Sequence, residues 1–406
     1  MRPLEQALRK LAPPSVEIGS GLDGPSVVIV GGGVIGWSCA YHILKLNPRS
    51  LVAVVEELPS SGMRSTGRAA GGVRAQFGTP VNIELSQFSK RAFARFEEEL
   101  GVDISFRQRG YLFVTATDAG RKYLESVVPL QASMRVGTQI ITPNEISTIA
   151  PYLNCDDLVC GSWCPDDGYL DPFSVCAGFE KASRRMGAVP LFNTTVSRVG
   201  RGVVGFENGA AAGEEEVTAD HVVIASGHLT SRLLGDELPV VPVAHQLALS
   251  EGTTELPKEL PMVVDLDTSF HFRSEGEGLL IGFDDKLKPV GVEQALKNPR
   301  FDDSFLSSFA DSGLHRLPAL EKVEFNPRKC WAGYYAETPD HHSIVGNHNG
   351  MIIAAGFGGH GIMHSPAAGQ AVAELVLGGR CVSFDLRPLR PSRFTEGDLT
   401  REPMVI

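Results

Sequence analysis

The chain has 406 residues with a formal net charge of -11 at pH 7, and 43% of its residues are hydrophobic. A chain of this length is expected to fold into two or three domains around a large core. Its acidic balance argues against a nucleic acid or an anionic membrane surface as a partner, because either would favour a basic face.

The start of the chain resembles neither a signal peptide nor a transit peptide in composition, so we expect a cytoplasmic protein. The most apolar run, from Val27 to Leu44, is long enough to raise the question of a membrane span. Four glycines interrupt this run, and a strand followed by a turn and a helix explains it better. We therefore expect no transmembrane segment.

The seven cysteines form no Cys-x-x-Cys pair. Cys155, Cys160 and Cys164 lie close together but lack the paired spacing of a zinc site. Reduced, mostly buried thiols and no bound metal are the expectation.

Hydrophobic periodicity predicts the elements in chain order. A tail of residues 1–25 leads into a buried strand from residue 26, a helix after the glycines and a second buried strand from residue 50, which together make a βαβ unit. Further helices are predicted over 81–100 and 172–186, and further strands over 109–117, over 221–227 and, several of them, within 240–290.

The first glycine-rich turn fits the pattern G-x-G-x-x-G at Gly31, Gly33 and Gly36. The first glycine permits the tight turn, the second admits a pyrophosphate against main-chain N–H groups, and the third lets helix and strand pack closely. Glu56 follows about 20 residues later, where a carboxylate can accept hydrogen bonds from ribose hydroxyls. A shift of one residue would place Glu57 there. The pattern predicts a dinucleotide site, without separating FAD from NAD; a glycine-rich turn without a ligand is the alternative.

A second glycine-rich stretch, from Gly356 to Gly361, precedes a helix near the end of the chain. Glycine lets the main chain approach a ligand closely, and a helix start offers free N–H groups at the positive end of the helix dipole. The alternative is a plain turn in which Ser365 and Pro366 start the helix and Gly378 ends it.

Four stretches together resemble the D-amino-acid oxidase superfamily of FAD enzymes, particularly the branch of sarcosine oxidase, sarcosine and dimethylglycine dehydrogenases and the β subunit of L-proline dehydrogenase. They are VVIVGGGVIG from Val27, STGRAAGGVR from Ser65, WAGYYAETPDHHSIVG from Trp331 and AAGFGGHGIMHSPAAGQAVAEL from Ala354. The resemblance spans nearly the entire chain.

This resemblance implies an α/β fold, in which a Rossmann-type FAD-binding domain is built from discontinuous segments and a β-rich α+β substrate domain is inserted. The segments 26–100, 176–240 and 346–385 are assigned to the FAD-binding domain, 101–175 and 241–345 to the substrate domain, and 386–406 to a tail.

The resemblance also implies how FAD is held. Ser65 to Gly72 would wrap the pyrophosphate and the flavin edge, Val196 would contact adenine, and the second glycine stretch would face the flavin edge that accumulates negative charge. The expected cofactor-binding residues are Gly31, Gly33, Gly36, Glu56, Ser65, Thr66, Gly67, Arg68, Ala70, Gly71, Val196, Ser226, Gly227, Gly333, Gly358, Gly359, His360, Gly361, Ile362 and Met363.

The activity implied is oxidation of a secondary or tertiary amine, in an N-methyl amino acid or a proline-like substrate, by hydride transfer to flavin N5. Arg74 stands at about the place of the carboxylate-binding arginine of monomeric sarcosine oxidase. Arg68 is the rival candidate for binding the carboxylate. The alternative role for Arg74 is a surface or structural salt bridge. Tyr334 and Tyr335 would line the pocket unless they belong to the core. Arg74, Tyr335 and His360 are the candidate catalytic residues, with His360 either donating to the flavin edge or only adjoining it.

The chain departs from monomeric sarcosine oxidase at several positions. Gly333 stands where that enzyme attaches FAD to a cysteine, and Cys330 lies three residues earlier, so noncovalent FAD is expected. Met363 and Leu280 stand at the places of two lysines, of which one assists carboxylate binding and the other the reaction with oxygen. Electrons could therefore pass to O2, as in an oxidase, or to a protein or quinone, as in a dehydrogenase.

Two other interpretations stay open. An NAD(P)-linked dehydrogenase would leave the second glycine stretch unexplained. A non-catalytic flavoprotein subunit or assembly factor with structural FAD would keep every FAD motif but lack a working substrate clamp.

Overall fold

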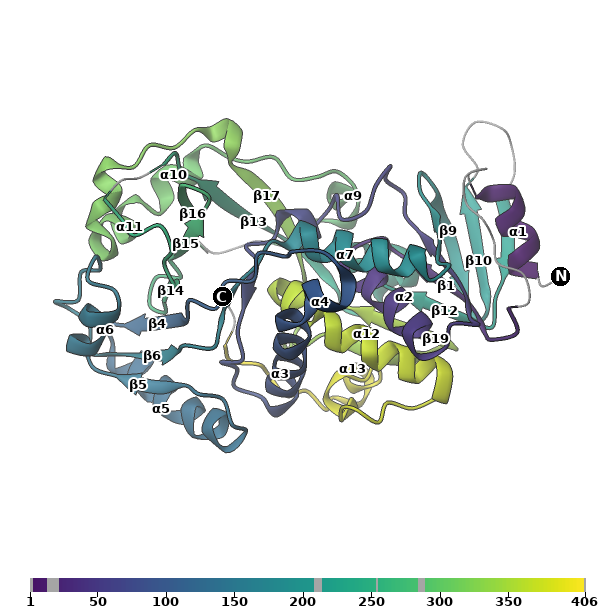
Figure 1. Cartoon of the computed structure of the whole chain (residues 1–406), viewed down its shortest axis with the longest axis horizontal. Coiled ribbons are helices and arrows are strands. Elements are labelled where there is room, and N and C mark those ends of the chain that lie inside the picture. Colours follow the sequence, from purple (N-terminus) through teal and green to yellow (C-terminus); the bar gives the residue numbers. More distant parts are fainter. Residues whose placement is uncertain (1–2, 13–21, 208–213, 253–254, 284–288, 405–406) are drawn as a thin grey trace.

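The computed structural model describes residues 3–12, 22–207, 214–252, 255–283 and 289–404. Two large sheets organise these residues, and they lie side by side along the long axis of the molecule in Figure 1. Each sheet draws its strands from several separate stretches of the chain.

The six-stranded sheet has the order β18-β19-β12-β1-β2-β8. Its strands are β1 (Ser26–Val30), β2 (Leu51–Val55), β8 (Val189–Leu191), β12 (His221–Ile224), β18 (Ile344–His348) and β19 (Met351–Ala355). All neighbours run parallel except β18 and β19. Every residue of β1 and β2 is buried, which explains their unbroken apolar sequences, since a covered parallel sheet hides both of its faces.

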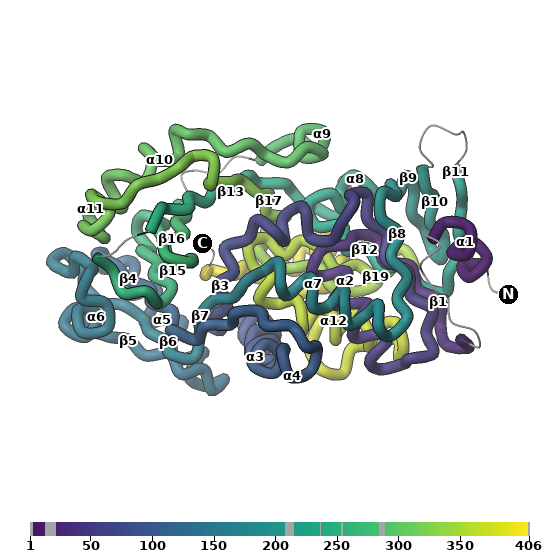
Figure 2. The backbone as a smooth tube through the Cα atoms, turned by 45° about the horizontal axis from the view of Figure 1, so that its top comes forward, coloured from purple at the N-terminus to yellow at the C-terminus, as the bar shows by residue number. Residues whose placement is uncertain are grey.

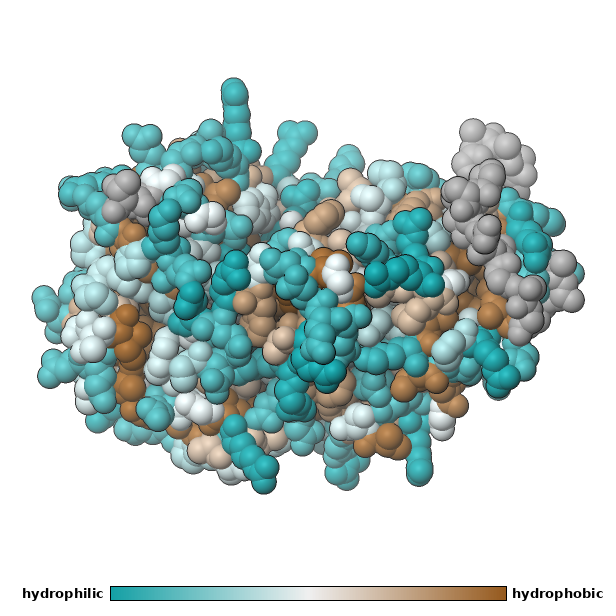
Figure 3. Space-filling view, viewed as in Figure 1, coloured by the Kyte–Doolittle hydropathy of each residue, from teal (hydrophilic) through white to brown (hydrophobic). Residues whose placement is uncertain are grey.

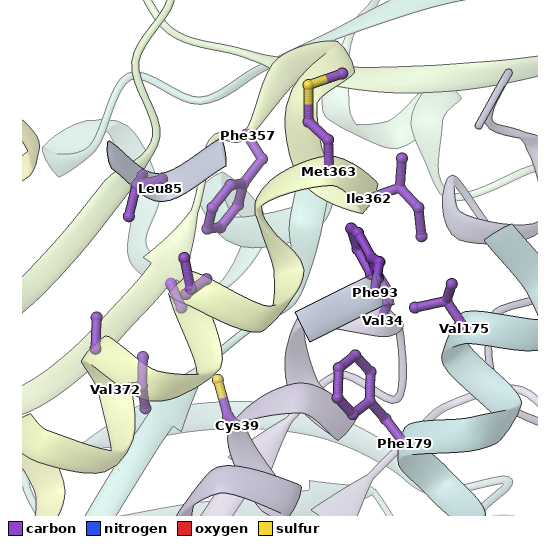
Figure 4. Close-up of a cluster of buried hydrophobic side chains, with 14 of the residues drawn as sticks. Val34, Cys39, Leu85, Phe93, Val175, Phe179, Phe357, Ile362, Met363 and Val372 are labelled. Atoms are coloured by element: carbon purple, nitrogen blue, oxygen red, sulfur yellow. The ribbon is translucent and has the colours of Figure 1, made fainter. Parts of the chain in front are cut away.

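Helices cover one face of this sheet. They are α2 (Val34–Leu46), α7 (Pro172–Arg185) and α12 (Gly361–Gly378). Figure 4 shows Val34 and Cys39 of α2, Phe179 of α7, and Ile362 and Val372 of α12 in one apolar cluster. The two glycine-rich turns lie at the starts of α2 and α12, so this packing holds both turns against one sheet.

A small antiparallel sheet covers the opposite face. It consists of β9 (Thr195–Gly200), β10 (Val203–Glu207) and β11 (Glu214–Thr218), and α1 (Pro3–Leu11) packs beside it. Leu4 and Leu8 of α1 are buried in this second cluster. Part of the expected tail thus joins the core, because α1 buries one apolar face, that of Leu4, Ala7 and Leu8.

The eight-stranded sheet has the order β17-β13-β16-β15-β14-β4-β6-β5. Its strands are β4 (Tyr111–Thr115), β5 (Gln139–Ile141), β6 (Cys160–Cys164), β13 (Val241–Leu249), β14 (Met262–Asp265), β15 (His271–Glu275), β16 (Gly278–Gly282) and β17 (Trp331–Glu337). Neighbours are antiparallel except β4 and β14.

The two faces of this sheet serve different cores. Leu112 and Phe272 pack on the face that α6 (Pro143–Ile149), α10 (Ser304–Ser308) and α11 (Ala310–Arg316) cover. Tyr111 and Met262 belong instead to the cluster that contains α2 and α12. The second face therefore looks toward the six-stranded sheet, and a site between the sheets receives residues from both.

The remaining elements complete the connections. They are α3 (Pro80–Ala94), α4 (Phe96–Leu100), α5 (Asp118–Ser133), α8 (Thr230–Leu234), α9 (Val292–Ala295), α13 (Arg393–Glu396), β3 (Gly72–Val73) and β7 (Gly168–Tyr169). The single helix predicted over 81–100 is two helices, because the chain bends at Arg95. This bend brings Phe96 against Phe179 of α7, with ring centroids 5.0 Å apart.

The chain returns to the centre of the molecule after α12. Arg393 and Glu402 are fully buried and Met404 is 2% exposed. Figures 1 and 2 both show the described end of the chain between the two large sheets, and Figure 2 shows it close to β3. Parts of the expected tail, 386–406, therefore reach the interior, because their polar groups pair with buried partners.

No helix in the described part of the chain is long and apolar enough to span a bilayer. The face in Figure 3 is mostly hydrophilic, with scattered apolar patches. All seven cysteines are free, and no group of metal-ligating side chains gathers among the described residues.

Candidate functional site

A large cavity opens at the carboxyl ends of the parallel strands. Val30 and Val55 end β1 and β2, and both line the cavity together with Ala225, which follows β12. Open α/β sheets bind their ligands at this edge. The cavity has an empty volume of about 1270 Å³, its mouth included.

The three glycines of the first turn meet different surroundings. A Cβ at Gly31, where φ is +111°, would lie 2.4 Å from the carbonyl oxygen of Ala225, and a Cβ at Gly36 would lie 1.9 Å from that of Gly31. Packing within the protein thus requires both. A Cβ at Gly33 would meet only the hydroxyl of Thr66, at 3.3 Å, and Gly33 lines the cavity. The space kept free at Gly33 fits a pyrophosphate approaching the start of α2.

Glu56 lies at the edge of the cavity with its carboxylate held by the main chain. Its Oε2 accepts from the N–H of Gly32 at 2.8 Å, and its Oε1 accepts from that of Leu58 at 2.9 Å. Burial raises the pKa of Glu56, and these two hydrogen bonds oppose the rise. A carboxylate offers about four acceptor positions, so room remains for ribose hydroxyls.

Glu57 also lines the cavity, where it forms an ion pair with Arg64 and lies 3.9 Å from Arg232. The two arginines are a cationic feature that sequence reasoning missed. Arg64 lies in a loop and Arg232 in α8, and neither belongs to a sequence motif. Only the fold brings them to one cavity.

The stretch from Ser65 to Gly72 divides into two parts. Ser65 and Thr66 line the cavity; the hydroxyl of Ser65 donates to the carbonyl of Tyr334, and that of Thr66 accepts from the N–H of Val34 at the start of α2. Arg68 instead donates to the carbonyl of Ala332 at 2.9 Å. The expected cofactor residues outside the cavity lining are Gly36, Gly67, Arg68, Ala70, Gly71, Gly333, His360 and Met363.

The residues expected near adenine and beside the pyrophosphate lie at the cavity. Val196, Ser226 and Gly227 line it. His228 beside them is 2% exposed, and burial lowers its pKa to about 4. Its neutral ring donates through Nε2 to the carbonyl of Ala295 at 3.2 Å.

The second glycine stretch reaches the same cavity from the opposite end of the chain. A single 3-10 turn, Gly358–His360, precedes α12, which begins at Gly361 and ends at Gly378. Pro366 therefore lies inside the helix and does not start it. The lining residues here are Gly358, Gly359, Gly361 and Ile362. The start of α12 thus offers its N–H groups to the cavity.

Arg74 lies in the interior beside this turn. It is 2% exposed; its Nη1 donates to the carbonyl of Gln76, its Nη2 donates to the carbonyl of Met404 at 2.7 Å, and its guanidinium lies 4.0 Å from the ring centroid of Phe77. Within the described residues, no carboxylate pairs with it. Arg74 is thus a buried cation whose neutral neighbours accept from some of its donors and do not neutralise its charge.

His360 turns its side chain toward Arg74 and away from the cavity. Its Nε2 lies 3.5 Å from Nη2 of Arg74. Burial first, and the charge of Arg74 second, lower the pKa of His360 well below its ordinary value. The ring is therefore neutral, and it joins the cavity wall to the arginine.

Tyr335 lines the cavity from the eight-stranded sheet. Its ring stacks on that of His245 in the neighbouring strand β13, with centroids 3.5 Å apart. Tyr334 also touches the cavity, yet it is 4% exposed and packs beside His228. His245 escaped the sequence analysis because only the pairing of β13 with β17 brings it to Tyr335.

The positions that depart from monomeric sarcosine oxidase are all apolar here. Gly333 packs against Arg68, and Cys330 belongs to the core on the far side of the eight-stranded sheet. Met363 lies in the helical cluster (Figure 4), and Leu280 is 3% exposed. Cys330, Leu280 and Met363 are not among the residues that line the cavity, and neither Leu280 nor Met363 carries a charge.

Comparisons with known proteins agree with this geometry. A family model described as FAD dependent oxidoreductase matches residues 26–375. FAD-dependent oxidoreductase domain-containing protein 1 of Xenopus laevis is 31% identical over 93% of this chain and 83% of its own length. Mitochondrial dimethylglycine dehydrogenase of Mus musculus is 27% identical over 93% of this chain, which spans 45% of that enzyme.

Among solved structures, L-proline dehydrogenase from P. horikoshii superposes with a TM-score of 0.81 at 28% identity, over 92% of this chain and 99% of that one. These similarities confirm the expected fold class and FAD as the cofactor. The dehydrogenase of Mus musculus is mitochondrial, so the cytoplasmic location stays a prediction.

Proposed function

The chain belongs to the family of FAD-dependent oxidoreductases in the D-amino-acid oxidase superfamily, and we propose that it oxidises the secondary or tertiary amine of an N-methyl amino acid or a proline-like substrate. The observation that carries this proposal is Arg74, a buried guanidinium without a carboxylate partner in the described part of the chain, one side chain away from the cavity. The names of the dimethylglycine and L-proline dehydrogenases support the substrate class.

FAD would be held by both glycine-rich turns and by the walls between them. The start of α2 at Gly33 and the hydroxyl of Thr66 would receive the pyrophosphate, and Glu56 would accept from the ribose. Bound there, FAD supplies the two-electron acceptor to which the substrate hydride passes, at flavin N5. Cys330 lies away from the cavity, which supports noncovalent attachment.

Arg74 would bind the substrate carboxylate. A guanidinium offers five N–H donors in a planar fork, and a carboxylate can accept two of them side by side. The carbonyl of Gln76 takes one Nη1 donor, and the carbonyl of Met404 and Nε2 of His360 take the two Nη2 donors. The second Nη1 donor and the Nε donor would remain for the substrate. An anion bound here would also neutralise a charge that burial makes costly. Positioning of this kind can supply much of the rate without a dedicated base.

The start of α12 would stabilise negative charge at its end of the cavity. Gly359 and Gly361 present main-chain N–H groups at the positive end of the helix dipole. His360 is neutral, so its ring adds no positive charge and accepts from Arg74. Tyr335, stacked on His245, would close the pocket from the eight-stranded sheet.

The electron acceptor would be O2 or a protein or quinone. Leu280 and Met363 place apolar groups where monomeric sarcosine oxidase has lysines. The absence of a cation at Leu280 favours slow reaction with oxygen and hence a dehydrogenase.

Anaerobic mixing with candidate substrates tests the proposal. The purified yellow protein is mixed with sarcosine, dimethylglycine, L-proline and D-amino acids, and the flavin absorbance is followed before and after air is admitted. Bleaching by an N-methyl amino acid or proline is expected, and slow recovery in air would identify a dehydrogenase.

Bleaching by primary D-amino acids alone would contradict the substrate class. No bleaching by any of these compounds, in protein with full FAD content, would favour the non-catalytic flavoprotein.

A further inference from the structure

The segment 399–404 ends in the interior of the protein, anchored by Glu402. This side chain is fully buried. Its carboxylate accepts four hydrogen bonds, from the N–H of Gly78 at 2.8 Å, the hydroxyl of Thr79 at 2.5 Å, the amide of Asn82 at 2.9 Å and the N–H of Met404 at 2.9 Å. The main-chain N–H of Glu402 donates to the carbonyl of Asp340 at 2.9 Å. A surface segment would not need an anchor of this kind.

Met404 connects this anchor to Arg74. Its N–H donates to Oε1 of Glu402, and its carbonyl accepts from Nη2 of Arg74 at 2.7 Å. One residue thus links a buried carboxylate to a buried guanidinium through its own main chain. The side chain of Met404 is 2% exposed and packs in the apolar cluster of α2 and α12.

This link fixes the direction in which Arg74 presents its remaining donors. The carbonyl of Gln76 holds Nη1, and that of Met404 holds Nη2, on a guanidinium that also lies over the ring of Phe77. Both acceptors are neutral, so they orient the group and leave its charge for an anion. Without the Met404 carbonyl, Nη2 would keep only Nε2 of His360, at 3.5 Å, as an acceptor, and the guanidinium could turn.

We propose that the segment 399–404 is part of the substrate site, and that Glu402 is a positioning residue that keeps the Met404 carbonyl on Arg74. The inference rests on the proposed binding of a substrate carboxylate by Arg74. It adds a part of the chain that no glycine motif or strand end marks. Glu402 itself does not touch the substrate in this scheme; it acts through Met404.

The test compares the holoenzyme with two altered forms, Glu402→Gln and a chain ending at Thr400. Glutamine has one acceptor oxygen in place of two, so it cannot receive all four donors. The matched control is Glu396→Gln, which removes the same charge from a half-exposed residue paired with Arg390. FAD content, hydrogen exchange at residues 399–404 where present, and the Kd of acetate and benzoate from the change in flavin absorbance are measured.

Both altered forms are expected to keep FAD and to bind the carboxylates about tenfold or more weakly, the scale of a lost hydrogen bond to a charged group. Exchange of the Met404 amide should become fast in Glu402→Gln. With a substrate, KM should rise more than kcat falls. Glu396→Gln should match the parent protein in every measurement.

Two outcomes would overturn the proposal. One is an unchanged carboxylate Kd in the chain ending at Thr400. The other is loss of FAD from both altered forms, which would make the segment a support of the whole fold. Arg74→Gln, measured in parallel, separates the two proposals. If it leaves carboxylate binding intact, the clamp itself is wrong; if it alone weakens binding, only the role of the segment is wrong.

Discussion

Nη2 of Arg74 lies 3.5 Å from Nε2 of His360, although the two residues are 286 positions apart in the chain. The contact joins the segment just after β3 to the turn before α12. It therefore connects the proposed substrate clamp to the turn that would face the flavin, and it makes the role of Arg74 the first point to test.

Arg74→Gln should raise the KM of a carboxylate substrate about a hundredfold, because hydrogen bonds to a buried charged group are lost. The FAD content should stay unchanged, since Arg74 does not line the cavity. Steady-state kinetics and the flavin spectrum check both points. Arg107→Gln is the control: Arg107 is half exposed and lies 3.9 Å from Glu259. Equal effects of the two changes would contradict the clamp.

Gly33→Ala and Gly36→Ala should separate cofactor binding from folding. The added Cβ at Gly36 would lie 1.9 Å from a main-chain oxygen, so we expect little folded protein. At Gly33 it would meet only a hydroxyl, at 3.3 Å, so the variant should fold but bind FAD weakly. Circular dichroism and FAD titration of the apoprotein measure the difference.

Gly378→Ala serves as the control for both glycine variants, because no atom lies within 4 Å of its added Cβ at the end of α12. It should fold and bind FAD normally. Full FAD affinity in Gly33→Ala would show that the open space at Gly33 does not serve the cofactor.

FAD should leave the protein on denaturation. The family resemblance predicts that Gly333 stands at the place of the attaching cysteine of monomeric sarcosine oxidase, and Cys330 belongs to the core on the far side of the eight-stranded sheet. Acid precipitation is expected to give a yellow supernatant, and the mass of the precipitated chain should equal that of the unmodified polypeptide. A mass increase by one FAD would refute noncovalent binding.

Buried neutral histidines should make the protein less stable in mild acid. Burial lowers the pKa of His42 and of His228 to about 4, and that of His364 to about 3, from an ordinary 6.5. The unfolded chain binds these protons first, so the stabilisation is complete above pH 6.5 and declines as the pH falls toward the folded pKa values. Each of these histidines should lower the free energy of unfolding by about 2 kcal/mol when the pH falls from 7 to 5.

Urea unfolding at pH 7 and pH 5 measures this decline. His42→Asn offers the simplest comparison, because His42 lies between α2 and α12 and donates through Nδ1 to the carbonyl of Ser38 within α2. The variant should lose less stability than the parent protein over the same pH interval. An identical loss in both would mean that His42 is not neutral in the folded state.

The sequence by itself determined the local chemistry of the site. Gly31, Gly33 and Glu56 are recognisable because a tight turn, a close approach and a strand end leave their marks within a few neighbouring residues. The same holds for the glycines before α12. The family resemblance added FAD, which the comparisons confirm. It also added the assignment of segments to domains, which stays a prediction.

Only the tertiary structure decided which distant residues meet. Arg64 reaches the cavity from a loop and Arg232 from α8, His245 meets Tyr335 through strand pairing, and Glu402 is buried in the core. None of these positions has a local pattern, because its role depends on packing between segments far apart in sequence. A turn is set by the torsion angles of its own residues, whereas the neighbours of Arg74 are set by the fold as a whole.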